Sequence, residues 1–408
     1  MKTQYPVIII GGGQAGLAMS YVLKQRDINH LIFEKHQIGH AWRHQRWDSF
    51  CLVTPNWQCQ LPGYPYAGND PEGFMAKDEI VQYLENYAKH FNPPIQEGVT
   101  VSQLSHHEQG FYLVTSQGDY EAEQVVIATG GYHTPNIPRL AERFPKQIKQ
   151  LHSVEYKNPE SLPDKILVVG TGQSGCQIAE DLHLAGKSVH LATGSAPRAP
   201  RRYRGKDVVE WLHLMGYYDL PIDDHPQKET VRHKTNHYLT GRDGGREIDL
   251  RRFALEGMQL YGRLADIGQT QISFQDNLQQ NLDHADAASE RIKSNIDEFI
   301  AKNGINAPVE PPYQPIWQPK NSPLRLDMQE IEAVIWCTGF HSNFRWVKLP
   351  VFDGEGEPVH HRGVTPVEGA YFLGLPWLYT WGSGRFCGVG RDATYLVEQI
   401  LAKQKVLL

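Results

Sequence analysis

Two short apolar runs, Pro6–Ile10 and Lys165–Val169, stand out from the otherwise mixed hydrophobic and polar pattern of the chain. Continuous β-branched runs of this length are typical of parallel strands that are buried on both faces. Each run is followed by a glycine-rich turn and then by apolar residues at helical spacing. The pattern therefore predicts two strand–turn–helix units, and with them an α/β fold.

Both turns carry the spacing Gly-x-Gly-x-x-Gly. In a dinucleotide-binding unit the first glycine makes the tight turn, the second lets the backbone approach a pyrophosphate, and the third lets helix and strand pack closely. One such motif is a weak signal, but two in the right context predict two Rossmann-like domains. The predicted phosphate-binding residues are Gly11, Gly13, Gln14, Ala15 and Gly16 in the first unit, and Gly170, Gly172, Gln173, Ser174 and Gly175 in the second.

The end of the second strand in each unit indicates which nucleotide binds there. In the first unit Glu34 is placed to accept the ribose hydroxyls of FAD or NAD, and we assign FAD to this site. Lys35, next to Glu34, is a further candidate for cofactor binding. In the second unit the strand 188–193 carries no acid, and a basic cluster follows it: Arg198, Arg201, Arg202, Arg204 and Lys206. The first three are the predicted ligands of the nucleotide. Arginine forks suit the 2′-phosphate of NADPH, although a solvated basic loop is the alternative.

The domain boundaries follow from proline-rich and glycine-rich segments. A strand ending in Ala128, Thr129 and Gly130 is echoed by a later one ending in Thr338 and Gly339, so we expect a discontinuous FAD domain. These five residues are also candidates for cofactor binding. We place the FAD domain at 1–150 and 325–408, and the inserted NADPH domain at 151–324. The NADPH domain should contain a helical insertion at about 203–304, and helices are expected over 78–91 and 278–300.

Composition and charge narrow the class further. The chain has 408 residues, a formal net charge of −6 and 40% hydrophobic residues, which suits a cytoplasmic α/β enzyme. A mildly acidic chain lacks the basic footprint of a nucleic-acid binder, and no run approaches the length of a membrane span. The five cysteines form no C-x-x-C pair, and no metal-ligand cluster is evident among the 19 histidines.

The motifs together make the chain resemble the flavin-containing monooxygenases, including the plant indole-pyruvate monooxygenases. The G-G-x-W motif of that family matches Gly39–Trp42 with one glycine replaced, the plant L-x-x-P-x-x-x-C-Q-L-P run matches Leu52–Pro62, and the Y-L-E-x-Y-A helix matches Tyr83–Ala88. The interdomain signature survives only in part, around His152–Tyr156. The chain also resembles a bacterial branch of flavin-dependent oxidoreductases through Trp47–Leu52 and Arg201–Gly205.

The resemblance implies further site residues. Trp42 and a glycine-rich turn that leads to Gly390 and Asp392 should lie against the flavin. The family's flavin-side asparagine aligns with Val53 here, and Asn56 close by is a candidate to replace it, with an ordinary loop asparagine equally consistent. His152 is a candidate for proton transfer, with a structural hydrogen bond between domains the favoured interpretation.

The resemblance also implies the chemistry. NADPH would reduce FAD, and the C4a-hydroperoxyflavin formed with dioxygen would oxygenate a small nitrogen-, sulfur- or carbonyl-containing metabolite. A flavin-dependent reductase or dehydrogenase that transfers no oxygen, and a non-catalytic redox flavoprotein, stay open as alternatives. The substrate is not indicated, and a homodimer stays open as well.

Overall fold

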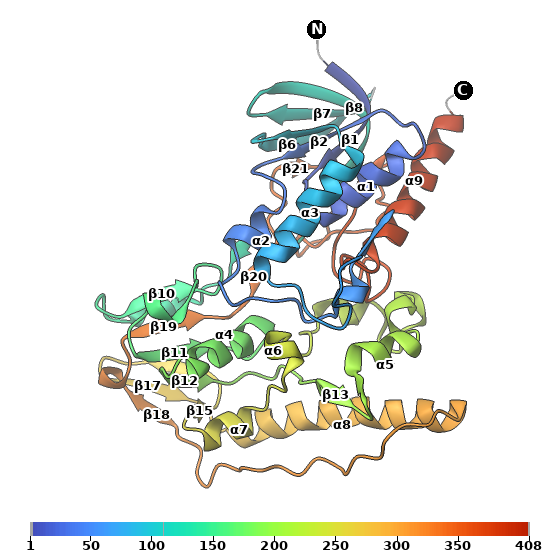
Figure 1. The fold of residues 1–408 in the computed structure, drawn as a ribbon. Helices are drawn as coiled ribbons and strands as arrows, with labels where there is room; N and C mark the ends of the chain where they lie inside the picture. Colours follow the sequence, from blue (N-terminus) through green and yellow to red (C-terminus); the bar gives the residue numbers. More distant parts are fainter. Residues whose placement is uncertain (1–2, 109, 407–408) are drawn as a thin grey trace.

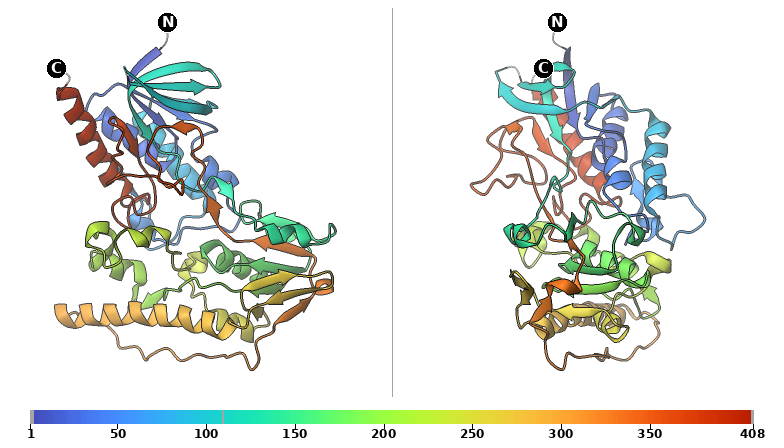
Figure 2. Two further views of the ribbon diagram at one scale, coloured as in Figure 1. Left: turned by 180° about the vertical axis from the view of Figure 1, so that it is seen from behind. Right: turned by 90° about the vertical axis from the view of Figure 1, so that its left-hand side faces the viewer.

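The computed structural model describes residues 3–108 and 110–406, which form two lobes stacked one above the other. Figure 1 shows both chain ends in the upper lobe, and Figure 2 shows the long helix α8 (Leu278–Asn303) running along the base of the lower one. Each lobe is built on its own sheet, and each sheet includes one of the two predicted apolar runs. The mixed α/β architecture expected from the sequence is confirmed.

The upper lobe is built on a mixed sheet with the strand order β21-β6-β7-β8-β1-β2-β5, to which β22 is added beside β8. The strands, in chain order, are β1 (Thr3–Ile10), β2 (His30–Glu34), β5 (Ile95–Glu97), β6 (Val101–His107), β7 (Gly110–Thr115), β8 (Gly118–Ile127), β21 (Val347–Lys348) and β22 (Ala370–Phe372). The central pairs β1–β2 and β1–β8 are parallel. Their apolar side chains are almost fully buried, as expected for strands covered on both faces.

The lower lobe is built on a wholly parallel sheet with the order β10-β19-β11-β12-β15. The strands are β10 (Lys149–His152), β11 (Lys165–Val169), β12 (Ser188–Ala192), β15 (Gln259–Tyr261) and β19 (Ala333–Trp336). A smaller antiparallel sheet joins β16 (Leu264–Ile267), β17 (Gln271–Phe274) and β18 (Arg325–Asp327). Each lobe thus contains a set of parallel strands, the arrangement that two dinucleotide-binding units require.

Sheet membership differs from the expected domain limits. Both β18 and β19 belong to sheets of the lower lobe, so the chain returns to the upper lobe after Trp336 and not before residue 325. The strand β10 likewise begins the lower sheet at Lys149, just ahead of the expected limit at 150. Within the expected insertion at 203–304, β15 pairs with β12, so that segment contains a strand of the lower sheet. These pairings depend on partners that are distant in sequence, which local patterns do not specify.

The two crossings between the lobes are joined to each other. The short strands β9 (Thr134–Pro135) and β20 (Phe340–His341) pair antiparallel, and the backbone N–H of Asn136 donates to the carbonyl of Gly339 at 2.9 Å. Figure 1 shows β20 between the two sheets. The outgoing and returning segments therefore form one ribbon.

The helices cover the sheets as their apolar stripes require. They are α1 (Gln14–Lys24), α2 (His40–His44), α3 (Lys77–Phe91), α4 (Gln173–Leu184), α5 (Val208–Leu214), α6 (Arg242–Gly245), α7 (Leu250–Leu255), α8 and α9 (Val389–Val406). The expected helices at 78–91 and 278–300 are confirmed as α3 and α8, and α8 ends at Gly304 with φ 62°. Within residues 3–108 and 110–406, none of the helices combines the length and the apolar character needed to cross a bilayer.

Candidate functional site

The first glycine-rich turn joins β1 to α1 and leaves no room for side chains at two of its glycines. A Cβ on Gly11, whose φ is +108°, would lie 2.6 Å from the carbonyl oxygen of Ala128, and one on Gly16 would lie 1.8 Å from that of Gly11. Gly13, the N-cap of α1, has open space around its Cβ position in the described part of the chain. This open side, at the positive end of α1, is where a pyrophosphate can approach the backbone.

The second turn, between β11 and α4, repeats this geometry closely. Gly170 has φ +105°, and a Cβ there would lie 2.6 Å from the carbonyl oxygen of Cys337. A Cβ on Gly175 would lie 1.9 Å from the carbonyl oxygen of Gly170. Gly172 caps α4 and faces Thr235 at 4.0 Å, and Gln173 is held by a hydrogen bond to the carbonyl of Leu239. The chain thus contains two phosphate cradles of one design.

The cradles differ where each second strand ends. In the first, Glu34 at the end of β2 accepts hydrogen bonds from the backbone N–H groups of Gly12 at 2.7 Å and His36 at 2.9 Å, which hold its carboxylate at the mouth of the cradle. In the second, the Thr193 hydroxyl follows β12 and accepts from the Asn281 amide at 3.0 Å. The first cradle therefore presents a negative charge to a ribose, and the second presents none on that strand.

Two of the three arginines predicted to bind phosphate form ion pairs with carboxylates of the protein. Arg198 pairs with Glu247 and Asp286 at 2.8 and 2.7 Å, and Arg201 pairs with Asp207. Both arginines are almost fully buried, whereas Arg202 is exposed and donates one hydrogen bond to the carbonyl of Gly244 at 3.3 Å. Arg202 forms no ion pair with any described residue, so its charge is the one of the three that is available to a ligand.

The glycine-rich segment before α9 packs onto the first cradle. The Gln14 amide donates to the carbonyl of Gly384 at 3.1 Å and accepts from the Trp42 indole at 3.4 Å. A Cβ on Gly374 would lie 2.6 Å from that of Ala15. These contacts bring the predicted residues Gln14, Ala15 and Trp42 together with the segment that leads to Gly390.

Asp392, in the first turn of α9, is a fully buried carboxylate without a partner of regular geometry. Neither of its oxygens has a hydrogen-bond partner among the described residues. Burial raises the pKa of Asp392 to about 6. The Ser383 hydroxyl, which lies close by without completing a regular hydrogen bond, and the charges of Arg391 and Arg362 act in the opposite direction and lower this pKa. A buried acceptor of this kind requires a ligand or water to satisfy it.

The residues after β8 and β19 occupy matching places next to the two cradles. The Thr129 hydroxyl is buried and unpartnered among the described residues, and the Cβ position of Gly130 faces open space. After β19, the Thr338 hydroxyl donates to the carbonyl of Asn136, and Gly339 has φ +83°. Thr129 and Gly130 are thus free to meet a ligand, whereas Thr338 is engaged in the ribbon between the lobes.

Asn56 and His152, the two candidate catalytic residues, are both engaged in structural hydrogen bonds. The Asn56 amide donates to the carbonyl of Asp70 at 2.9 Å, and its oxygen accepts from the backbone N–H of Met75 at 2.7 Å. The buried His152 ring contacts the carbonyl of Gly339 through Nε2 at 3.0 Å and accepts from the Val154 N–H through Nδ1 at 3.3 Å. Burial lowers the pKa of His152, which favours the neutral ring that these bonds require. These contacts fit the structural interpretation of His152.

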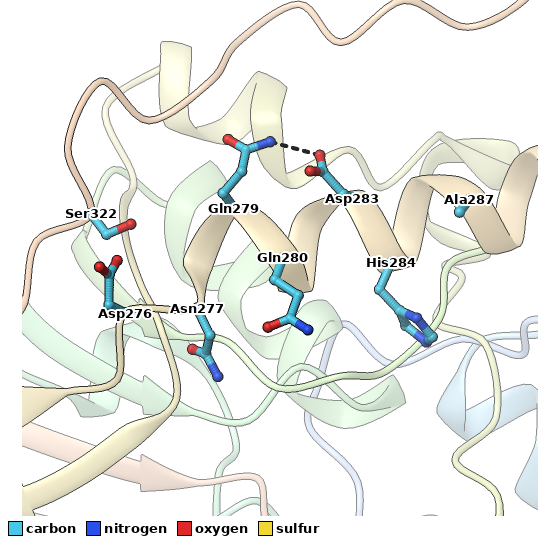
Figure 3. Close-up of a pocket in the computed structure, with 8 residues that line it drawn as sticks. All are labelled: Asp276, Asn277, Gln279, Gln280, Asp283, His284, Ala287 and Ser322. Carbon is cyan, nitrogen blue, oxygen red and sulfur yellow. Dashed lines mark hydrogen bonds between the residues drawn. The ribbon is translucent and has the colours of Figure 1, made fainter.

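An open hollow of about 620 Å³ lies along the start of α8, away from these residues. Figure 3 shows Gln279 and Asp283, joined by a 2.7 Å hydrogen bond, on one side of the helix, and Gln280 and His284 on the other. None of the predicted cofactor residues lines this hollow. Elsewhere in the described chain, no group of three or more His, Cys, Asp or Glu side chains is arranged to hold a metal ion.

The paired cradles agree with the comparison to protein families. Residues 8–239, more than half of the chain, match the model of the pyridine nucleotide-disulphide oxidoreductases. The chain belongs to this family. Pyridine nucleotide-disulphide oxidoreductases of this type are enzymes that bind FAD and NAD(P)H, which suits two cradles in one chain.

The chain is similar to several known oxidoreductases and monooxygenases, over part or nearly all of its length. The oxidoreductase CzcO-like of Geobacillus kaustophilus is 36% identical over 97% of this chain and 98% of its own length. The probable indole-3-pyruvate monooxygenase YUCCA10 of Arabidopsis thaliana is 34% identical over 53% of this chain and 58% of its own. The solved flavin-containing monooxygenase of Stenotrophomonas maltophilia shares the fold, with a TM-score of 0.66 and 21% identity over 98% of this chain and 99% of that one. The expected resemblance to flavin-containing monooxygenases is thereby confirmed.

Two buried polar residues near the site were not among the expected ones. Gln58, 2% exposed, and Tyr218, 3% exposed, have side-chain polar atoms without a hydrogen-bond partner among the described residues. They come from segments about 160 positions apart, and neither carries a local motif. Their proximity is created by the fold, and the sequence contains no signal for it.

Proposed function

We propose that the protein is an NADPH-dependent, FAD-containing monooxygenase that oxygenates a small nitrogen-, sulfur- or carbonyl-containing metabolite. The observation that carries the proposal is the pair of cradles with the same glycine geometry and different ribose ends. The resemblance to monooxygenases favours oxygen transfer over simple hydride transfer. When bound, the flavin would take a hydride from the nucleotide and activate dioxygen.

The first cradle fits FAD. Gly11, Gly13 and Gly16 would hold the pyrophosphate against the start of α1, and Glu34 would accept the adenosine ribose hydroxyls. The buried and unpartnered oxygens of Asp392 and Thr129 supply further acceptors beside this cradle, which the hydroxyl groups of a ribityl chain can satisfy. The start of α9 would place backbone N–H groups and a positive helix end near the flavin ring.

The second cradle fits NADPH through Gly170, Gly172 and Gly175 at the start of α4. Of the predicted arginines, Arg202 would bind the 2′-phosphate, because Arg198 and Arg201 are already paired with carboxylates. Arg198 and Arg201 would then shape the loop that presents Arg202. His152 would position the ribbon between the lobes without moving a proton.

A second candidate function is an FAD-dependent reductase or dehydrogenase that transfers no oxygen. The observation that favours it is the altered interdomain signature, in which Lys146 and Ile148 stand where the monooxygenases resembled by this chain have phenylalanine and glycine. A non-catalytic flavoprotein is the third candidate.

Anaerobic reduction followed by exposure to air separates these functions. Loss of flavin absorbance on adding NADPH is expected, and air with a panel of amines, thioethers and ketones should yield product carrying one atom of labelled dioxygen. Reduction followed only by stoichiometric hydrogen peroxide with every compound would favour the reductase. A flavin that NADPH does not reduce would favour the non-catalytic protein, and a purified chain that cannot bind FAD would overturn all three.

A further inference from the structure

The Gln58 side chain is a buried amide whose hydrogen-bonding groups are not satisfied by the protein. It is 2% exposed, and both its Nε2 and its Oε1 lack a hydrogen-bond partner among the described residues. A primary amide offers two donors and an acceptor, and leaving such a group unpaired in the interior is unfavourable. A ligand that pairs with both of its polar atoms would remove this cost.

The surroundings of Gln58 come from three distant parts of the chain. Burial raises the pKa of Tyr218, after α5, opposed in part by the Gln58 amide, which lies beside the phenol without completing a hydrogen bond of regular geometry; Arg385 and Cys387 lie near the same phenol. Its hydroxyl is also unpartnered among the described residues, and its ring stacks on Trp381 with centroids 4.7 Å apart. The amide is therefore enclosed by the short segment 56–62, the start of the lower-lobe insertion, and the glycine-rich segment before α9.

The same segment 56–62 packs against the start of α9. A Cβ on Gly390 would lie 2.7 Å from the ring of Pro62, and Cys59 lies close enough to Cys387 for the two thiols to interact electrostatically. The backbone carbonyl of Tyr218 accepts from the N–H of Gly382 at 3.3 Å, which ties Tyr218 to this region. Gln58 thus lies at the helix end where the proposed function places the flavin ring.

We propose that Gln58 binds the pyrimidine edge of the flavin. Its Nε2 donates to a ring carbonyl oxygen, and its Oε1 accepts from the adjacent N3–H, so that both unsatisfied atoms are used at once. The inference rests on the proposed FAD site. The pyrimidine edge alternates carbonyl oxygen and N–H, and an amide is the side chain whose donor and acceptor match that alternation.

The carboxamide of a nicotinamide presents a similar edge, but the packing favours the flavin. Gln58 belongs to the segment that contacts the start of α9 through Pro62, whereas the contacts of the second cradle run to Thr235 and Leu239. The Tyr218 hydroxyl next to the amide would complete the shell around the same carbonyl oxygen. Donors to a ring carbonyl stabilise the negative charge that spreads over this ring on reduction.

The test compares Gln58→Leu and Gln58→Glu with wild-type holoenzyme, and uses Gln60→Leu as a matched control. Gln60 is two residues along, is exposed, and bonds only to the carbonyl of Trp57 at 2.9 Å among the described residues. We expect Gln58→Leu to bind FAD about tenfold more weakly, as the loss of one or two net hydrogen bonds implies. The flavin midpoint potential should become more negative, and more so in Gln58→Glu, because a carboxylate repels the reduced ring. Gln60→Leu should match wild type in both.

An FAD analogue methylated at N3 makes the test specific. The methyl group removes the N3–H, so Gln58→Leu should weaken binding of the analogue less than threefold, against about tenfold for FAD itself. Equal penalties for FAD and the analogue, or a potential and an affinity unchanged in Gln58→Leu, would overturn the inference. So would a variant in which only the KM for NADPH rises, since the amide would then face the nicotinamide. Wild-type protein that cannot bind FAD would instead overturn the proposed function beneath it.

Discussion

The two cradles are nearly identical at their glycines and different at their ribose ends. Gly11 and Gly170 have φ values of +108° and +105°. A Cβ on Gly16 would lie 1.8 Å from the carbonyl oxygen of Gly11, and a Cβ on Gly175 would lie 1.9 Å from that of Gly170. Beyond the turns, only the first has a carboxylate, that of Glu34, at the strand end. In the proposed sites the shared part would bind the pyrophosphate, which all dinucleotides have in common, and the divergent part would select among the dinucleotides.

The largest loss of stability should come from substituting Gly16, whose Cβ would make the closer of these two contacts. Gly16→Ala would force a Cβ into the carbonyl of Gly11, so we expect the free energy of unfolding to fall by more than about 4 kcal/mol, an exceptional loss for one methyl group. Gly13→Ala is the matched control, because its Cβ position is open in the described chain and its φ of −75° suits any residue. Urea denaturation should show Gly13→Ala close to wild type, while its flavin content after gel filtration drops. Equal stability of both variants would contradict the role given to Gly16.

Arginine substitutions should separate structure from recognition in the second cradle. Arg201→Ala leaves the buried Asp207 carboxylate unpaired, and we expect a loss of about 3–5 kcal/mol in unfolding free energy. Arg202→Ala should change stability by less than about 0.5 kcal/mol. It should also lower the ratio of kcat/KM for NADPH to that for NADH about tenfold, through loss of a charge-assisted bond. A ratio that Arg202→Ala leaves unchanged would remove the last predicted arginine from the phosphate site.

Asp392 should make the stability of the FAD-free protein depend on pH. Its pKa rises from 3.8 to about 6 on folding, so the folded state holds the proton more tightly and stability falls as the pH rises from about 4 to about 6. Asp392→Asn should therefore be more stable than wild type by about 3 kcal/mol at pH 7, and nearly equal to it near pH 4. Urea titrations of both apoproteins across this range give the measurement. An identical pH profile for the two would show that Asp392 does not carry the effect.

The smallest effect is expected at the ribose. Glu34→Gln keeps one acceptor for the Gly12 N–H but loses the charge, so FAD should bind about tenfold more weakly while the fold is unchanged. Glu123→Gln removes the charge of an exposed carboxylate on β8 of the same sheet and serves as the control. Fluorescence titration of apoprotein with FAD measures both. A variant of Glu34 with wild-type affinity would show that the two cradles do not differ in the way proposed.

Local patterns were sufficient for the glycine turns, for α3 and for α8, because backbone geometry and amphipathic spacing are written in neighbouring residues. They were insufficient where partners lie far apart. The pairing of β15 with β12 and of β19 with β11 moved the limits between the lobes, since any apolar run can join several sheets.

The site shows the same division. The geometry of the glycine turns was predictable. The ion pairs of Arg198 and Arg201 were not, because they depend on Glu247, Asp286 and Asp207, which lie up to 88 positions away along the chain. A basic cluster in sequence does not reveal which of its charges are already neutralised. Gln58 gave no signal at all, because an unsatisfied amide becomes visible only once its surroundings are known.

The ribbon formed by β9 and β20 constrains how the upper and lower halves can move. Because Asn136, Gly339 and His152 tie the outgoing and returning segments together, neither tether can swivel independently of the other. A displacement of one segment is therefore transmitted to the other, so that the two lobes are joined by a paired connection and not by two separate single strands.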